Sequence, residues 1–186
     1  MVMYLCGGGS KQSWVKLADF DYTKSLTDSI RAITGSNSGC TRNENGIYFP
    51  SANALITYSA FASIWRVPQT AIELDIGNGS IINNSNNNRL IMWQSLNGLV
   101  WRGSGTKGWA VYNGSWSNAI SNDTNFFNNS TIRIEILTGS KVAIYKNNTK
   151  LGEFGMGNIG DYTLGSSQTS CYGIYIKAMR LYIKNI

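Results

Sequence analysis

Histidine is absent from the 186-residue chain, and cysteine, proline and charged residues are scarce. The absence of histidine excludes Ser-His-Asp and Cys-His catalysis as well as histidine-ligated metal sites. Cys6, Cys40 and Cys171 lie far apart without a Cys-x-x-Cys motif, and their odd number does not predict a disulfide framework. We therefore expect free thiols, with one optional disulfide pair.

Long apolar runs are missing as well. No stretch approaches the roughly 20 apolar residues of a transmembrane helix, and Met1–Leu5 is too short for the core of a signal peptide. The net charge is +6, but the cations are scattered and form no basic run. We therefore expect no nucleic-acid partner, no membrane insertion, and synthesis in the cytoplasm without a signal peptide.

Residues 131–154 carry the clearest structural pattern. Isoleucine alternates with charged residues along 131–136, which is the period of a strand with one buried and one exposed face. A Thr-Gly-Ser turn at 138–140 and an Asn-Asn turn at 147–148 follow, and the alternation resumes between them. This predicts a three-stranded antiparallel meander, whose apolar face needs a second sheet to cover it.

The same period recurs at 70–76, where the apolar side chains face one way and Glu73 and Asp75 the other. The last expected strand, 173–184, switches its apolar parity near Lys177 and Ala178, which indicates a β-bulge. Short strands separated by Gly- and Asn-containing turns are typical of an all-β sandwich or barrel.

No linker or repeat divides the chain, so we predict a flexible lead-in over residues 1–12 and one domain over 13–186. Residues 26–33 have weak helical or turn character, and 35–45 are expected to form a polar loop. Further short strands are expected at 14–22, 46–49, 54–58, 89–93, 99–102 and 109–113.

Four segments in order carry a resemblance to a known family. They are Phe-Asp-Tyr…Ser-Leu-Thr-Asp-Ser at 20–29, Gly-Ile-Tyr-Phe at 46–49, Val-Ala-Ile-Tyr-Lys-Asn at 142–147 and Gly-Ile-Tyr-Ile…Arg-Leu-Tyr at 173–182. Together they resemble the laminin-G-like jelly-roll branch of the concanavalin A-like lectin/glucanase superfamily, with Asn148 where Gly is usual. The resemblance implies a single-domain jelly-roll β-sandwich of two antiparallel sheets. Such modules occur in extracellular binding proteins, glycoside hydrolases and phage tail or head-fibre proteins, so the fold alone does not assign a function.

The Glu-Leu-Asp-Ile sequence at 73–76 resembles the catalytic strand of laminarinase-type glucanases, which implies a nucleophile at Glu73. The acid/base position would fall at Gly77 or Asn78, and neither side chain donates a proton. A retaining glycosidase needs two carboxyl groups about 5 Å apart. We therefore predict no catalytic residue and place Glu73 and Asp75 among the ligand-binding residues. A degenerate glucanase that uses Glu73 is one alternative.

Three of the six tryptophans, Trp101, Trp109 and Trp116, crowd one segment. Aromatic faces stack on sugars, while Asn, Ser and Arg supply hydrogen bonds. If the flanking strands form a hairpin, Trp101 and Trp109 share a face opposite to Arg102. We therefore predict Trp116, Arg102 and Asn113 as the exposed ligand-binding set. The alternative is that these tryptophans are core residues, as we expect for Trp14, Trp65 and Trp93.

We expect no cofactor and no metal. Members of the resembled superfamily often bind Ca²⁺, which takes about 6–8 oxygen ligands, but no Asp-x-Asp-x-Asn loop is present. The alternative is a calcium site with ligands among the scattered aspartates Asp19, Asp21, Asp28, Asp123 and Asp161.

Taken together, the sequence predicts a non-catalytic carbohydrate or cell-surface recognition module in a phage virion or another extracellular assembly. The resemblance and the lack of a signal peptide motivate the virion hypothesis. The expected partners are a glycan or cell-surface polymer, other assembly subunits, and further copies in a homo-oligomer. A purely structural capsid, head-fibre or tail subunit is the main alternative.

Overall fold

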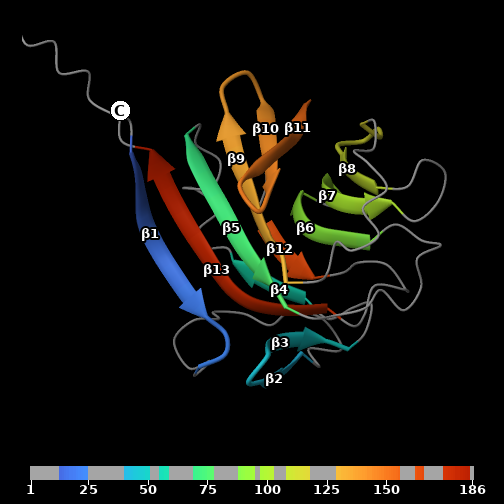
Figure 1. Ribbon diagram of the computed structural model, residues 1–186. Coiled ribbons are helices and arrows are strands. Elements are labelled where there is room, and N and C mark those ends of the chain that lie inside the picture. Colours follow the sequence, from blue (N-terminus) through green and yellow to red (C-terminus); the bar gives the residue numbers. More distant parts are fainter. Residues whose placement is uncertain are drawn as a thin grey trace, which may run out of the picture.

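The computed structural model of the protein is built of β-strands throughout the part of the chain that it describes (Figure 1). It describes residues 13–24, 40–50, 55–58, 69–77, 88–94, 97–102, 108–117, 129–155, 162–165 and 174–184. Across these ranges, no helix is long and apolar enough to cross a membrane. The strands are β1 (Trp14–Asp21), β2 (Thr41–Asn43), β3 (Gly46–Phe49), β4 (Leu55–Tyr58), β5 (Thr70–Ile76), β6 (Asn88–Gln94), β7 (Asn97–Arg102), β8 (Gly108–Tyr112), β9 (Thr131–Leu137), β10 (Lys141–Lys146), β11 (Thr149–Gly155), β12 (Tyr162–Gly165) and β13 (Ile174–Lys184).

Eight strands form the larger sheet, in the order β11-β10-β9-β5-β13-β3-β2, with β1 beside β13. All of its pairings are antiparallel, and β9, β10 and β11 are the predicted meander. Asn147 and Asn148 turn this meander with φ angles of 48° and 65°, which asparagine tolerates better than most residues. The long strand β13 pairs with β5 along one edge and with β3 and then β1 along the other.

The smaller sheet has five strands in the order β4-β12-β6-β7-β8, again with antiparallel pairing. Figure 1 shows β6, β7 and β8 as a separate layer beside the larger sheet. The fold is therefore the predicted all-β jelly-roll sandwich of two antiparallel sheets.

The aliphatic side chains that alternate along β5 and β9 form the centre of the core. Each contributes about 1.5–3 kcal/mol to folding when it is fully buried. Their charged neighbours in sequence point to the opposite, solvent-facing side of the larger sheet, as the alternation predicts. All six core residues that were expected from the sequence are buried, namely Ile72, Leu74, Ile76, Ile132, Ile134 and Ile136.

Two strands differ from the sequence prediction. β2 lies inside the expected polar loop at 35–45, and all three of its residues are exposed at the sheet edge, so no apolar period marks it. β12, a strand of four residues, was not among the strands expected from the sequence. The lead-in at 1–12 and the segment 26–33 lie outside the described residues.

Candidate ligand-binding surface

The solvent-facing side of the larger sheet carries a row of alternating charges across four neighbouring strands. Asp19 of β1 lies opposite Arg180 of β13. Arg180 lies opposite Glu73 of β5, and Glu73 opposite Arg133 of β9. Neighbouring strands lie about 4.8 Å apart, so each charge in this row has opposite charges within contact distance.

Arg180 is the centre of this charged row. One terminal nitrogen donates to the Glu73 carboxylate at 2.9 Å, and the other donates to Asp75. Its Nε lies 3.5 Å from the Asp19 carboxylate. The hydrogen bond to Asp75 is the largest cause that raises the pKa of Arg180, and the bond to Glu73 adds to it. The two carboxylates that resemble catalytic groups therefore share one guanidinium.

Two further groups donate to or approach Glu73. The Tyr182 hydroxyl donates to its carboxylate at 3.3 Å, and Arg133 lies 3.5 Å away. Burial raises the pKa of Tyr182, and the negative charge of Glu73 raises it further. Directly opposite Glu73, the flanking strands present Arg180 and Arg133, and the nearby carboxylate of Glu135 is bound to the same Arg133 guanidinium.

Of the two positions where the glucanase motif could place its acid/base residue, Gly77 is crowded by its neighbours, and Asn78 lies outside the described residues. A Cβ atom added at Gly77 would lie 3.1 Å from both the Lys177 Cε and the Tyr175 Cβ. Such contacts are tighter than ordinary van der Waals packing, so a glutamate here requires its neighbours to move. Gly77 also donates its backbone N–H to the Tyr175 carbonyl at 2.9 Å, which fixes it beside β13.

Trp14 was expected in the core, and this expectation is wrong. Its ring lies on the solvent-facing side of the larger sheet, with the Arg133 guanidinium 4.4 Å from its centroid. The same guanidinium lies 4.7 Å from the Tyr182 ring centroid. Arg133 also donates to Glu135 at 2.9 Å. The partly buried Arg133 guanidinium therefore covers one face of the Trp14 ring and one face of the Tyr182 ring, and a ligand cannot stack on those two faces.

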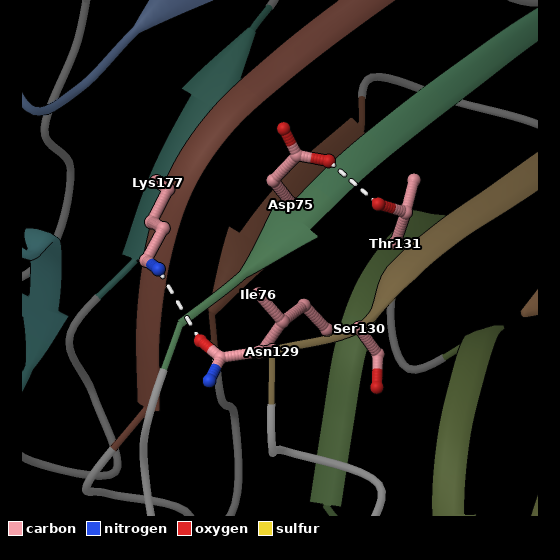
Figure 2. Close-up of a pocket in the computed structure, with 6 residues that line it drawn as sticks. All are labelled: Asp75, Ile76, Asn129, Ser130, Thr131 and Lys177. Carbon is pink, nitrogen blue, oxygen red and sulfur yellow. Dashed lines mark hydrogen bonds between the residues drawn. The ribbon is translucent and has the colours of Figure 1, made fainter. Parts of the chain in front are cut away.

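A pocket of about 250 Å³ opens where β5 ends, β9 begins and β13 bulges (Figure 2). The Thr131 hydroxyl donates to Asp75 at 2.9 Å, and the Lys177 ammonium donates to the Asn129 side-chain oxygen at 3.2 Å. The backbone N–H of Ile76 donates to the Ser130 carbonyl at 2.8 Å, which ties the end of β5 to the start of β9. The lining residues are Asp75, Ile76, Asn129, Ser130, Thr131 and Lys177.

A pair of tyrosines lies next to this pocket on the same side of the sheet. Tyr48 of β3 is the cross-strand partner of Tyr175 of β13, and the rings stack with centroids 4.7 Å apart. Both side chains are half-buried, whereas their neighbours Ile47 and Phe49 are buried in the core. Tyr175 and Lys177 both border Gly77, so the aromatic pair adjoins the polar pocket.

The tryptophan-rich segment folds as the predicted hairpin of β7 and β8. Trp101 lies opposite Trp109, and Arg102 lies opposite Gly108. The side chains of these residues lie outside the part of the structure that is described. Trp116 follows β8 and is half-buried.

Trp116 and Asn113 lie together at the end of the smaller sheet. The Trp116 ring packs against Tyr112 with centroids 4.9 Å apart, and the two residues form a β-bridge. The Asn113 side-chain nitrogen donates to the Gly155 carbonyl at 3.0 Å, which joins β8 to the edge strand β11. The predicted ligand-binding residues therefore fall into two groups, since Glu73 and Asp75 lie on the other sheet.

The two described aspartates proposed as alternative calcium ligands have partners of their own. Asp21 accepts from the Thr23 hydroxyl at 2.6 Å and lies 3.0 Å from the Lys24 ammonium. The Thr23 hydrogen bond is the largest cause that lowers the pKa of Asp21. Asp19 pairs with Lys16 and Arg180. Within the described ranges no three acidic, Cys or His side chains gather as a metal site, and Asp28, Asp123 and Asp161 fall outside those ranges.

No protein-family model matches the chain, and no curated protein matches it. Solved structures do resemble it. The binding domain of botulinum neurotoxin serotype D has a TM-score of 0.59 at 12% identity, over 92% of this chain and 49% of that one. Trypanosoma rangeli sialidase has a TM-score of 0.53 at 12% identity, over 77% of this chain and only 26% of that one. The kappa-carrageenase of Pseudoalteromonas carrageenovora, in complex with an oligotetrasaccharide of kappa-carrageenan, has a TM-score of 0.52 at 10% identity, over 99% of this chain and all of that one.

These likenesses show only the fold, a β-sandwich, because identities of 10–13% carry no information about individual site residues. The chain spans about a quarter of the sialidase and about half of the toxin domain.

Sequence reasoning found Asp75 but missed its pocket partners Asn129, Thr131 and Lys177. Asn129 and Thr131 flank the start of β9, where the sequence shows only the edge of an Asn- and Ser-rich loop. The parity switch in β13 was the available signal for Lys177. The register shift between Ile176 and Ala178 confirms the predicted bulge, and a bulge re-aims a side chain.

Proposed function

We propose that the protein is a non-catalytic recognition module that binds a carbohydrate or cell-surface polymer at the pocket beside Asp75. One observation carries this proposal: a polar pocket and a stacked tyrosine pair adjoin each other on the open face of the larger sheet. Sugars need both kinds of contact, because their ring faces stack on aromatic groups and their hydroxyls form hydrogen bonds. The fold likeness to a neurotoxin binding domain and to a carrageenase supports the proposal as an analogy of fold alone.

Binding to a glycan array, followed by calorimetry on the best ligand, tests the location of the site. Thr131→Val removes a hydroxyl from the pocket while keeping the shape of the side chain, and Tyr175→Leu removes the stacked ring. Both variants should weaken binding while the melting temperature stays close to that of the parent. Trp116→Ala tests the hairpin site predicted from the sequence. If Trp116→Ala alone abolishes binding, the ligand binds at the end of β8 and the pocket assignment is wrong.

The charged row supports the non-catalytic part of the proposal. Glu73 is held by Arg180, Arg133 and Tyr182, and the motif offers no acid/base residue at Gly77. The purified chain should therefore release no reducing sugar from β-glucans above the blank. Release that disappears in Glu73→Gln would establish the glucanase alternative instead.

We further propose that this module works as part of a phage virion or another surface assembly, as a homo-oligomer. Val15 and Leu17 of β1 support subunit contacts, because their side chains are 40% and 46% exposed on a strand at the sheet edge. This observation also favours the second candidate, a capsid, head-fibre or tail subunit that binds only other subunits. Light scattering should give the mass of a closed oligomer, and Val15→Ser with Leu17→Ser should reduce it. A monomer at high concentration would contradict the assembly proposal.

A further inference from the structure

Lys177 differs from Asp75, the other charged residue of the pocket, because its side chain has no oppositely charged partner among the described residues. Asp75 pairs with Arg180, which it shares with Glu73 and Asp19, and also accepts from Thr131. Lys177, in contrast, has a neutral partner, the side-chain oxygen of Asn129 at 3.2 Å. No acidic side chain of the described ranges forms an ion pair with it, whereas Arg133 and Arg180 on the same face each contact carboxylates. Within the described residues, Lys177 is therefore the pocket cation that has no carboxylate partner.

The backbone around Lys177 is held in place by several contacts. Lys177 is the extra residue of the bulge in β13, between Ile176 and Ala178, which pair with consecutive residues of β5. Its carbonyl accepts from the backbone N–H of the fully buried Tyr22 at 2.8 Å. Its aliphatic stem passes over Gly77, where any larger residue would crowd the Cε atom. The ammonium group thus points toward the Asn129 side-chain oxygen, as Figure 2 shows.

We propose that Lys177 and Asn129 form an anion subsite, so that the ligand is a saccharide carrying a carboxylate or sulfate group. This inference rests on the proposed function and names the ligand class of the same pocket. The pocket volume of about 250 Å³ lies just below the range of about 300–1,000 Å³ for drug-sized ligands, which suits one sugar unit rather than a longer segment. The acidic substituent lies against Lys177 and the sugar ring extends toward the Tyr175 and Tyr48 pair.

A hydrogen bond between charged groups explains why the pocket should bind an acidic saccharide more tightly than a neutral one. An ammonium group that exchanges a neutral amide oxygen for an anionic oxygen gains a shorter and stronger bond. A gain of this kind corresponds to roughly tenfold tighter binding of an acidic saccharide than of its neutral counterpart. The preference should shrink at high salt, since the site is open to solvent.

Calorimetry on the full chain with matched oligosaccharides tests the subsite. The probes are a uronic-acid oligosaccharide, a sulfated oligosaccharide and the neutral parent of each. Lys177→Met removes the charge and keeps the stem over Gly77, and Lys177→Arg keeps the charge. Lys141→Met is the matched control for net charge, because Lys141 is exposed at the end of β10 away from Thr131.

The expected result is a preference of about tenfold for one acidic class, which is lost in Lys177→Met, retained in Lys177→Arg and unchanged in Lys141→Met. Comparison of the carboxylated and sulfated probes tells which group is recognised. If Lys177→Met and Lys141→Met lower the preference for acidic probes equally, that preference comes from general attraction by the net charge of +6. This result would overturn the subsite. Equal affinity for acidic and neutral probes overturns the subsite but keeps the proposed function. If no saccharide of either class binds, the proposed function itself fails.

Discussion

Replacing Arg180 with methionine is the most informative test of the charged row on the larger sheet. The substitution keeps the aliphatic stem over the sheet and removes the guanidinium. Glu73 then retains Arg133 at 3.5 Å and the Tyr182 hydroxyl at 3.3 Å. Asp75 loses its charged partner and retains only the neutral Thr131 among its described contacts. The structure therefore predicts that most of the cost arises at Asp75.

The size of the loss follows from the exposure of the groups left behind. Exposed ion pairs contribute about 0.2–1 kcal/mol, whereas removal of one partner from a buried pair costs about 3–5 kcal/mol. The carboxylate side chains of Glu73 and Asp75 are 15% and 27% exposed, which lies between these limits. We expect Arg180→Met to lower the free energy of unfolding by about 2–3 kcal/mol. Adding Asp75→Asn should recover part of the loss, because it removes the unpaired charge.

Urea denaturation monitored by tryptophan fluorescence measures this loss, and a double-mutant cycle between Arg180 and Asp75 isolates their coupling. Lys150→Met is the matched control. Lys150 pairs with Glu153, but both side chains are more than 40% exposed, so its removal should leave the urea midpoint unchanged. If Arg180→Met costs no more than Lys150→Met, the charged row is loosely solvated. Glu73 would then be available for chemistry, and the non-catalytic assignment would lose its main support.

Two further predictions concern the backbone and the alkaline limit of stability. Gly46→Ala should lower the free energy of unfolding by at least about 3 kcal/mol, because φ is 110° and the new Cβ would lie 2.4 Å from the Ile176 carbonyl oxygen. The control Gly139→Ala, at φ 74° in open space, should lower it by only about 1–2 kcal/mol in the same urea assay. Burial raises the pKa of Tyr182 and Tyr145 above the usual 10, with Glu73 and Glu135 adding to it, so the folded state holds these protons more tightly than the unfolded chain. Stability should therefore be intact below pH 10 and fall above it, and Tyr182→Phe should flatten that fall in thermal melts; an unchanged slope would contradict the raised pKa.

The fold could be predicted from the sequence because its central strands bury one face each. In β5 and β9 the alternation of isoleucine or leucine with charged residues fixes both the strand and its orientation. β13 could be predicted with its bulge, since the parity of the buried residues changes there. The edge strand β2 could not be predicted, because a strand exposed on both faces has no apolar period.

The candidate site was harder to predict, because its residues are brought together by register rather than by a local motif. Glu73 and Asp75 stood out because of their spacing, but that spacing describes any strand with an acidic outer face. Their partner Arg180 lies more than a hundred residues away and is placed beside them only by the pairing of β5 with β13. Trp14 was misassigned for the same reason, since the cation that covers it comes from β9.

The cations on the solvent-facing side of the larger sheet have two different roles, one in stability and one in recognition. Arg133 and Arg180 are planar donors that contact carboxylates on neighbouring strands, and such pairing uses the geometry that arginine offers best. Lys177 is a point charge on a flexible stem, placed by a bulge where the ladder of pairs is interrupted. The arginines of the sheet pair with its own carboxylates and so stabilise the scaffold. Lys177 has no such carboxylate partner among the described residues, so its charge can bind a ligand. On this reasoning, mutations along the arginine row should change stability before affinity, whereas mutations at the bulge should change affinity before stability.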